Sequence, residues 1–166
     1  MLLFGVGSYA GGACEVPSYT YLPFLDRTGF IPSKKYVNQS EIADYAEMLA
    51  DYCGIRENVR FSRKVTDMIY LDEGTWQIST FNMETDSEGE TVYAKHVVSA
   101  NGPLSSPRMP EVPGMEVFKG ESFHTASWNR KASLAGKRVG VIGTGASAAQ
   151  VITSIADEVE LSLIHI

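Results

Sequence analysis

The residues whose types and spacing could do chemistry form a glycine-rich segment, Gly143-Thr144-Gly145-Ala146-Ser147-Ala148, which has the pattern GxGxxA. A short apolar run precedes it and a helical pattern follows, so it would be the turn between a strand and a helix. There the first glycine permits a tight bend, the second lets a pyrophosphate approach the backbone, and the small third residue keeps the helix close to the sheet. The helix-terminal amides would bind the anion, with added hydrogen bonds from Ser147 and Gln150. The segment therefore predicts a dinucleotide site.

One alternative interpretation and a second match to the same pattern have to be considered. A glycine-rich turn can bind nothing, but strand, turn and helix fall in register here, which favours the nucleotide. A second GxGxxA match, from Gly5 to Ala10, is rejected because Gly11, Gly12 and Pro17 interrupt any helix after it. The residue that distinguishes NAD from NADP is expected about 20 positions after the turn, past the last residue, so the turn itself leaves that choice open.

The apolar spacing predicts the elements that would position the turn. Ile42, Tyr45 and Leu49 recur at helical intervals, with Ser40 as the cap and Gly54 as the stop. A small antiparallel meander followed by a buried strand is predicted by β-type runs at 59–61, 65–71, 76–81 and 91–100, separated by polar turns at 72–74 and 86–90.

The remaining segments complete this outline. We expect an ordered loop over residues 5–23, and the four prolines within residues 101–113 predict that this segment is a connection without helix or central strand. After it, a strand at 138–142, a helix at 149–156 and a second strand at 159–166 form most of one βαβ unit.

The composition excludes several classes of protein. A hydrophobic content of 44% with 20% charged residues is that of a globular protein, and a net charge of -6 with scattered Lys and Arg argues against nucleic acid as a partner. The apolar start, Met1 to Phe4, is too short for a signal peptide, so we expect a cytoplasmic protein without stable membrane insertion. Cys14 and Cys53 predict neither a disulfide framework nor a metal site.

Phe118, Gly120, His124 and Trp128, which precede the turn in the sequence, have the spacing FxGxxxHxxxW. This resembles the fingerprint of Baeyer-Villiger monooxygenases, which stands just before the second nucleotide-binding motif of that family. Residues 9–15 resemble the family's YPGxxCD segment, with Ala10 in place of Pro and Glu15 in place of Asp, and residues 100–105 resemble its ATGxLS turn.

The resemblance implies an α/β fold with two Rossmann-like dinucleotide-binding domains, here incomplete, and a β-meander in the FAD domain. Residues 1–108 would be a partial FAD-binding domain without its first GxGxxG, and 109–133 a linker that carries the fingerprint. Residues 134–166 would begin the NADP-binding domain. We therefore expect the chain to be an internal piece of a longer protein.

The resemblance also implies roles for individual residues. Glu15 would lie beside the flavin and His124 would couple the two nucleotide domains as a hinge, although a purely packed histidine remains an alternative. FAD would contact Cys14, Glu15, Tyr21 and Val65. NADPH would be bound by Gly143, Thr144, Gly145, Ala146, Ser147, Ala148 and Gln150. No metal is expected.

The activity implied by the resemblance is that of an FAD- and NADPH-dependent monooxygenase, which inserts one atom of O2 into a ketone to give an ester or lactone. Asn129 stands where the family usually has Pro or Asp, which keeps open a flavin monooxygenase that oxygenates nitrogen or sulfur. The partners would be a small ketone or heteroatom substrate and O2. A third interpretation is a catalytically inert partial gene product with residual nucleotide binding, and we expect the isolated chain to be inactive.

Overall fold

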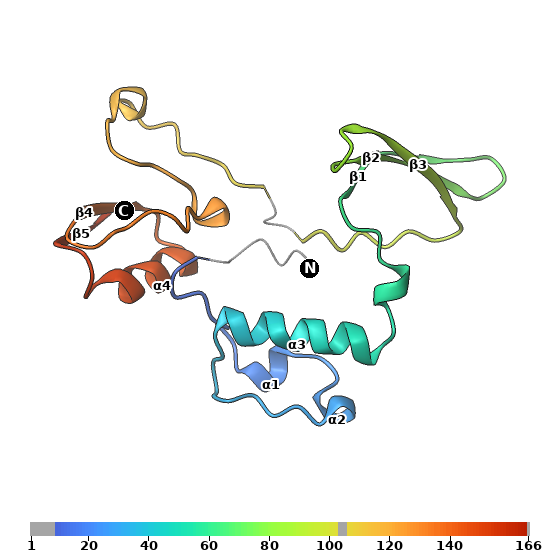
Figure 1. Ribbon diagram of the computed structural model, residues 1–166, viewed down its shortest axis with the longest axis horizontal. Helices are drawn as coiled ribbons and strands as arrows, with labels where there is room; N and C mark the ends of the chain where they lie inside the picture. The colour runs from blue at the N-terminus through green and yellow to red at the C-terminus, as the bar shows by residue number, and fades with distance from the viewer. Residues whose placement is uncertain (1–8, 103–105, 166) are drawn as a thin grey trace. The chain divides into compact units, whose positions relative to one another are not determined.

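The computed structural model describes residues 9–102 and 106–165, and only the backbone of 163–165. The chain divides into two compact units, one made of Met1–Cys53 with Leu104–Ile166 and the other of Gly54–Pro103 (Figure 1). The described residues do not include the apolar start, residues 5–8 of the rejected GxGxxA match, the last three residues of the ATGxLS-like segment, or Ile166. The predicted domain boundaries at 108 and 133 stay predictions.

The N-terminal part of the first unit packs three helices around a small core. They are α1 (Ser18–Tyr21), α2 (Leu25–Thr28) and α3 (Gln39–Tyr52). The buried residues of this core are Cys14, Leu22, Val37 and Tyr45. Ser18 is also buried, and its hydroxyl donates to the carbonyl of Lys35 at 3.0 Å while accepting the amide of Val37 at 2.9 Å. The loop predicted for 5–23 thus contains one short helix.

The helix predicted from Ile42, Tyr45 and Leu49 is confirmed as α3, and these residues all face the core. The chain turns after it at Gly54, whose φ is +61°. The predicted cap at Ser40 was wrong, because the N-cap is Asn38. Asn38 forms an antiparallel bridge with Ala13, which fixes the backbone just before the first turn.

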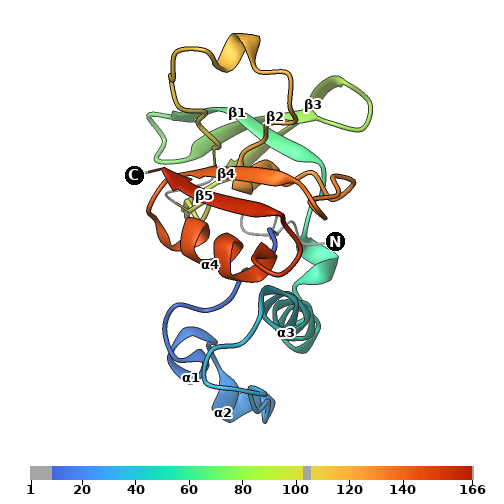
Figure 2. The ribbon, with the colours of Figure 1, turned by 90° about the vertical axis from the view of Figure 1, so that its left-hand side faces the viewer.

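The predicted βαβ unit is confirmed at the other end of the same unit. β4 (Arg138–Ile142) and β5 (Leu161–His165) form a parallel pair connected by α4 (Ala146–Ile155). Figure 2 shows α4 along one face of these strands, with Ala148, Val151 and Ile155 buried on its inner side. The helix begins three residues before the predicted position 149, because Gly145 is extended and serves as the N-cap.

The segment between α3 and β4 that belongs to the first unit is irregular. Within residues 106–137 the structure has only two short 3-10 turns, η2 (Met115–Val117) and η3 (Thr125–Ser127). The predicted connection without helix or strand is therefore confirmed for 101–102 and 106–113. The irregular segment 106–137 also contains the fingerprint residues and leads directly to β4.

The second unit contains the predicted meander, after a 3-10 turn η1 (Arg56–Asn58). The antiparallel strands are β1 (Arg63–Tyr70), β2 (Trp76–Asn82) and β3 (Ser87–Ala94), in the order β1-β2-β3. The register shifts between Ser79 and Phe81, where β3 presents a glycine, Gly89, whose Cβ would lie 2.4 Å from the Thr80 hydroxyl.

Two strand predictions and one turn prediction in this unit were wrong. Residues 59–61 are not a strand, because the chain leaves η1 through an extended residue and a turn before β1. The polar residues 87–90 belong to β3, since the tight turn is made earlier and ends at Asp86 with φ +52°. The predicted buried strand at 91–100 ends at Ala94, and most of its residues are exposed.

No helix within the described ranges is long and apolar enough to cross a membrane. No cluster of three or more His, Cys, Asp or Glu side chains suited to a metal ion occurs in that part of the chain.

Candidate functional site

The turn between β4 and α4 contains two glycines with different backbone conformations. Gly143 has φ +131°, a backbone conformation that residues with a Cβ rarely adopt. Gly145 has φ -71° and ψ 171°, which any residue can adopt, and a Cβ there would meet no heavy atom within 4 Å. Because the fold does not require a glycine at 145, the open space beside it fits a ligand that approaches the backbone closely.

The first turn of α4 is suited to bind an anion. Gly145 provides no side-chain cap, and the first turn contains no acidic residue. The amides of Ala148 and Ala149 both donate to the carbonyl of Gly145, at 3.0 and 3.2 Å, so the earlier amides have no carbonyl of the preceding turn to bind. The N-terminus of this ten-residue helix therefore carries a partial positive charge that is available to bind a phosphate group.

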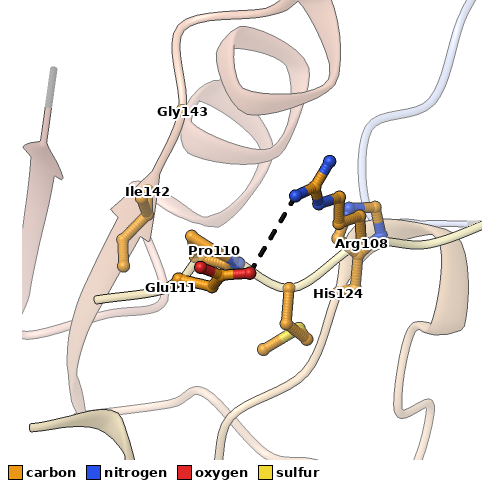
Figure 3. Close-up of a pocket in the computed structure, with 7 residues that line it drawn as sticks. Arg108, Pro110, Glu111, His124, Ile142 and Gly143 are labelled. Atoms are coloured by element: carbon orange, nitrogen blue, oxygen red, sulfur yellow. Dashed lines mark ion pairs between the residues drawn. The ribbon is translucent and has the colours of Figure 1, made fainter. Parts of the chain in front are cut away.

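A cavity of about 500 Å³ lies next to the turn, within the first unit (Figure 3). Its walls are Arg108, Met109, Pro110, Glu111, His124, Ile142 and Gly143. Arg108 and Glu111 approach each other to 3.9 Å but are both highly exposed. Such a pair contributes little to stability, so the Arg108 guanidinium remains able to interact with a negatively charged ligand.

His124 lies in the wall of this cavity, half-buried, as the N-cap of η3. Its Nδ1 accepts the amide of Ala126 at 3.0 Å. In the neutral imidazole the proton is therefore on Nε2, which is a hydrogen-bond donor. The structure thus brings His124 and Gly143, predicted from separate motifs, to one cavity. The next aromatic of the fingerprint, Trp128, packs edge-on against Phe123 with ring centroids 5.0 Å apart.

The side chains of Ser147 and Gln150, predicted to add hydrogen bonds to the nucleotide, contact the N-terminal segment within the chain. Ser147 Oγ donates to the hydroxyl of Tyr9 at 3.0 Å, and that hydroxyl donates to Gln150 Oε1 at 2.7 Å. Gln150 Nε2 donates to the carbonyl of Ala13 at 3.1 Å. Of the predicted nucleotide ligands, Ala148 is buried, whereas Thr144 and Ala146 are exposed at the turn.

The residues predicted to contact the flavin lie in two places. Cys14 is buried in the small core, and burial raises the pKa of its thiol, opposed by a hydrogen bond with Ser18 and increased by the charge of Glu41. Glu15 and Tyr21 are exposed in the same part of the first unit. Val65 is half exposed on β1 of the second unit. A thiol with a raised pKa is a poor nucleophile, so Cys14 is suited to packing.

The sequence predictions missed the wall of the cavity at residues 108–111, as well as Tyr9. Nothing in the local pattern around Arg108 distinguishes it from other residues of a proline-rich connection. Tyr9 did belong to a recognised segment, but its contact with Gln150 joins residues 141 positions apart. Only the paired presence of the two motifs could have suggested it.

Comparisons with known proteins show which family this chain is similar to. The profile of the flavin-binding monooxygenase-like family matches residues 12–165. A Baeyer-Villiger monooxygenase of Streptomyces coelicolor is 39% identical over 157 residues, which cover 92% of this chain and 28% of that protein. A polycyclic ketone monooxygenase of Thermothelomyces thermophilus is 35% identical over 167 residues, covering 89% of this chain and 25% of that one. The chain thus spans about a quarter of the length of these relatives.

Solved structures give the same result for the fold. Cyclohexanone monooxygenase in its loose conformation, with ε-caprolactone bound, superposes with a TM-score of 0.84 at 38% identity, covering 97% of this chain and 31% of that one. The complex of OTEMO with FAD and NADP gives a TM-score of 0.82 at 33% identity, covering 95% and 30%. The predicted Rossmann-like flavoprotein fold, with its meander, is therefore confirmed. The chain belongs to the flavin-binding monooxygenase-like family.

Proposed function

We propose that this chain is part of an FAD- and NADPH-dependent monooxygenase that converts a ketone, O2, NADPH and a proton into an ester or lactone, NADP+ and water. The observation that carries the proposal is the open space at Gly145 at the start of α4, in a chain that also has the FxGxxxHxxxW spacing. The relatives support it, since those compared above are named as Baeyer-Villiger, polycyclic ketone and cyclohexanone monooxygenases.

In this proposal the NADPH pyrophosphate binds to backbone amides of the turn at residues 143–148. Gly143 makes the bend, Gly145 leaves room for the phosphates, and Ala148 holds the helix against the sheet. Arg108, in the wall of the adjacent cavity, would add a positive charge. Residues 134–166 would thus begin the NADP domain, after a linker at 109–133 and a partial FAD domain at 1–108.

FAD would be contacted by Cys14, Glu15, Tyr21 and Val65, and together with NADPH it would supply the hydride and oxygen chemistry. The residues of this chain would bind and orient the two cofactors. Glu15 would place a carboxylate beside the flavin, and the exposure of its side chain leaves it accessible to a cofactor. His124 would act as a hinge between the nucleotide domains. The hydrogen bond from the Ala126 amide to its Nδ1 would keep the proton of the neutral imidazole on Nε2.

The products of the reaction test the proposed activity. The protein expressed from its complete gene would be supplied with NADPH, O2 and either a cyclic ketone, a tertiary amine or a thioether. We expect a lactone, formed in equal amount to the NADPH consumed, with a reaction lacking substrate as the control for uncoupled oxidation. Amine oxide or sulfoxide without lactone would instead support the heteroatom-oxygenating alternative, which Asn129 keeps open. Absence of flavin would overturn both.

The isolated 166 residues are proposed to be inactive and marginally stable. Among the described residues, β4 and β5 form a two-stranded parallel sheet, whereas parallel sheets normally have more strands and helices on both faces. Ile142 at the end of β4 is 57% exposed. Calorimetry of the purified fragment should therefore give no sharp unfolding transition, and a cooperative transition would contradict this part of the proposal.

A further inference from the structure

The side chain of Gln150 is engaged by the backbone of the N-terminal segment. Its Oε1 accepts the amide of Ala13 at 3.4 Å and its Nε2 donates to the carbonyl of Ala13 at 3.1 Å. The hydroxyl of Tyr9 donates to the same Oε1 at 2.7 Å. An amide oxygen accepts about two hydrogen bonds and an amide nitrogen donates two. Three of the four positions of this side chain are therefore used within the chain.

Tyr9 extends this contact to the first turn of α4. Its hydroxyl accepts the Ser147 hydroxyl at 3.0 Å while it donates to Gln150, so Ser147, Tyr9 and Gln150 form a directed chain of hydrogen bonds. All three side chains are half-buried. The single hydroxyl hydrogen of Ser147 is thus directed at Tyr9.

Gly11 shows how closely the two segments approach. A Cβ at this position would lie 2.4 Å from the carbonyl oxygen of Gln150 and 2.7 Å from Cβ of Ser154. Both obstacles belong to α4, and the first is backbone, which cannot rotate away. Gly29 has a similar positive φ, +68° against +78°, but a Cβ there would meet nothing within 4 Å. The glycine at position 11 is therefore required by the contact as well as by its backbone conformation.

We propose that Tyr9 and Gln150 are positioning residues, which together with Gly11 hold the segment that carries Cys14 and Glu15 against the dinucleotide helix. We call this contact the clasp. The inference rests on the proposed function, in which the segment contacts FAD and the helix binds NADPH. The clasp would then set the distance between the two cofactor sites, and the nucleotide phosphates would be bound by backbone amides rather than by Ser147 and Gln150 side chains.

Kinetics of flavin reduction separate a positioning role from a nucleotide-binding role. In the protein expressed from its complete gene, we would measure the dissociation constant for NADP+ and the rate of flavin reduction at saturating NADPH. Gln150→Met should lower the rate about tenfold and Tyr9→Phe about threefold, since each lost hydrogen bond loosens the alignment. The dissociation constant should change less than about twofold. A dissociation constant raised about tenfold with an unchanged rate would overturn the inference and make Gln150 a nucleotide ligand.

Two matched controls separate the clasp from general damage. Gly11→Ala should lower the reduction rate about tenfold or more, whereas Gly29→Ala, at a similar φ but with open space, should leave it unchanged. Thr153→Val removes a hydroxyl of the same helix whose hydrogen bonds, within the described part of the chain, go to the carbonyls of Ala149 and Gln150, and it should also have no effect. Equal losses in Gly11→Ala and Gly29→Ala would refute the steric part of the argument.

A second measurement does not depend on the activity. The unfolding midpoints of Tyr9→Phe, Gln150→Met and the double variant form a cycle. We expect the double variant to shift the midpoint by less than the sum of the two single shifts, because both substitutions remove the Tyr9–Gln150 hydrogen bond, whereas only Tyr9→Phe also removes the bond from Ser147. Additive shifts would refute the clasp. If the unaltered protein is not reduced by NADPH, the proposed function fails, and this cycle still decides whether the clasp exists.

Discussion

Replacing Gly145 with alanine should separate nucleotide binding from folding. The new methyl group would meet no heavy atom within 4 Å, and the backbone there, φ -71° and ψ 171°, is allowed for alanine. The only folding cost is a poorer N-cap, about 0.5–1 kcal/mol. If a pyrophosphate occupies the space beside Gly145, the methyl removes at least one charge-assisted hydrogen bond, worth about 1.5–3 kcal/mol. That corresponds to a dissociation constant for NADP+ raised roughly ten- to a hundredfold.

In the protein expressed from its complete gene, which is also used for the predictions below, calorimetric titration with NADP+ and thermal unfolding of the same samples would measure both effects. Gly140→Ala is the matched control, because it adds the same methyl to β4, also in open space, and should change neither quantity. Gly143→Ala should weaken NADP+ binding and also lower the thermal stability, since φ +131° costs a residue with a Cβ about 1–3 kcal/mol of strain. The reasoning is refuted if Gly145→Ala binds NADP+ within about twofold of the unaltered protein.

Two further predictions concern the small core of the first unit. Ser18→Ala should lower the free energy of unfolding by about 1–3 kcal/mol, because the Val37 amide loses its buried acceptor; the exposed Ser133→Ala is the control in thermal unfolding, and equal shifts would contradict the prediction. Burial raises the pKa of the Cys14 thiol, so less thiolate forms at a given pH. Iodoacetamide, followed by mass spectrometry from pH 7 to 9, should label the exposed Cys53 first, and faster labelling of Cys14 would show that it is accessible.

The sequence predicted the local part of the site well. β4, the turn and α4 are contiguous, and their apolar spacing and glycines act within a few residues, so the predicted strand at 138–142 matches β4 in both bounds. The start of α4 was placed three residues late, because the extended backbone of Gly145 as N-cap cannot be read from its residue type. The α3 helix was predicted for the same local reason, from Ile42, Tyr45 and Leu49.

The rest of the site depends on contacts between distant residues. Arg108 and His124 reach the cavity beside Gly143 through an irregular connection, whose path no periodicity encodes. The strand predicted at 91–100 failed because β-branched residues such as Val97 and Val98 favour extended backbone, yet β2 pairs with β3 only as far as Ala94. Pairing therefore determined where the strand ends, and propensity did not.

The backbone at Ala13 has hydrogen-bonding neighbours on two sides, the Gln150 amide on one and the residues around Asn38 on the other. The amide proton of Ala13 is donated to a side chain, whereas that of Cys14 is donated to the carbonyl of Val37 at 2.9 Å, inside the core. In deuterated solvent the first should exchange whenever Gln150 swings away, and the second only when the core itself opens. The ratio of the Ala13 and Cys14 exchange rates therefore reports how often this segment opens locally, separately from the unfolding of the unit.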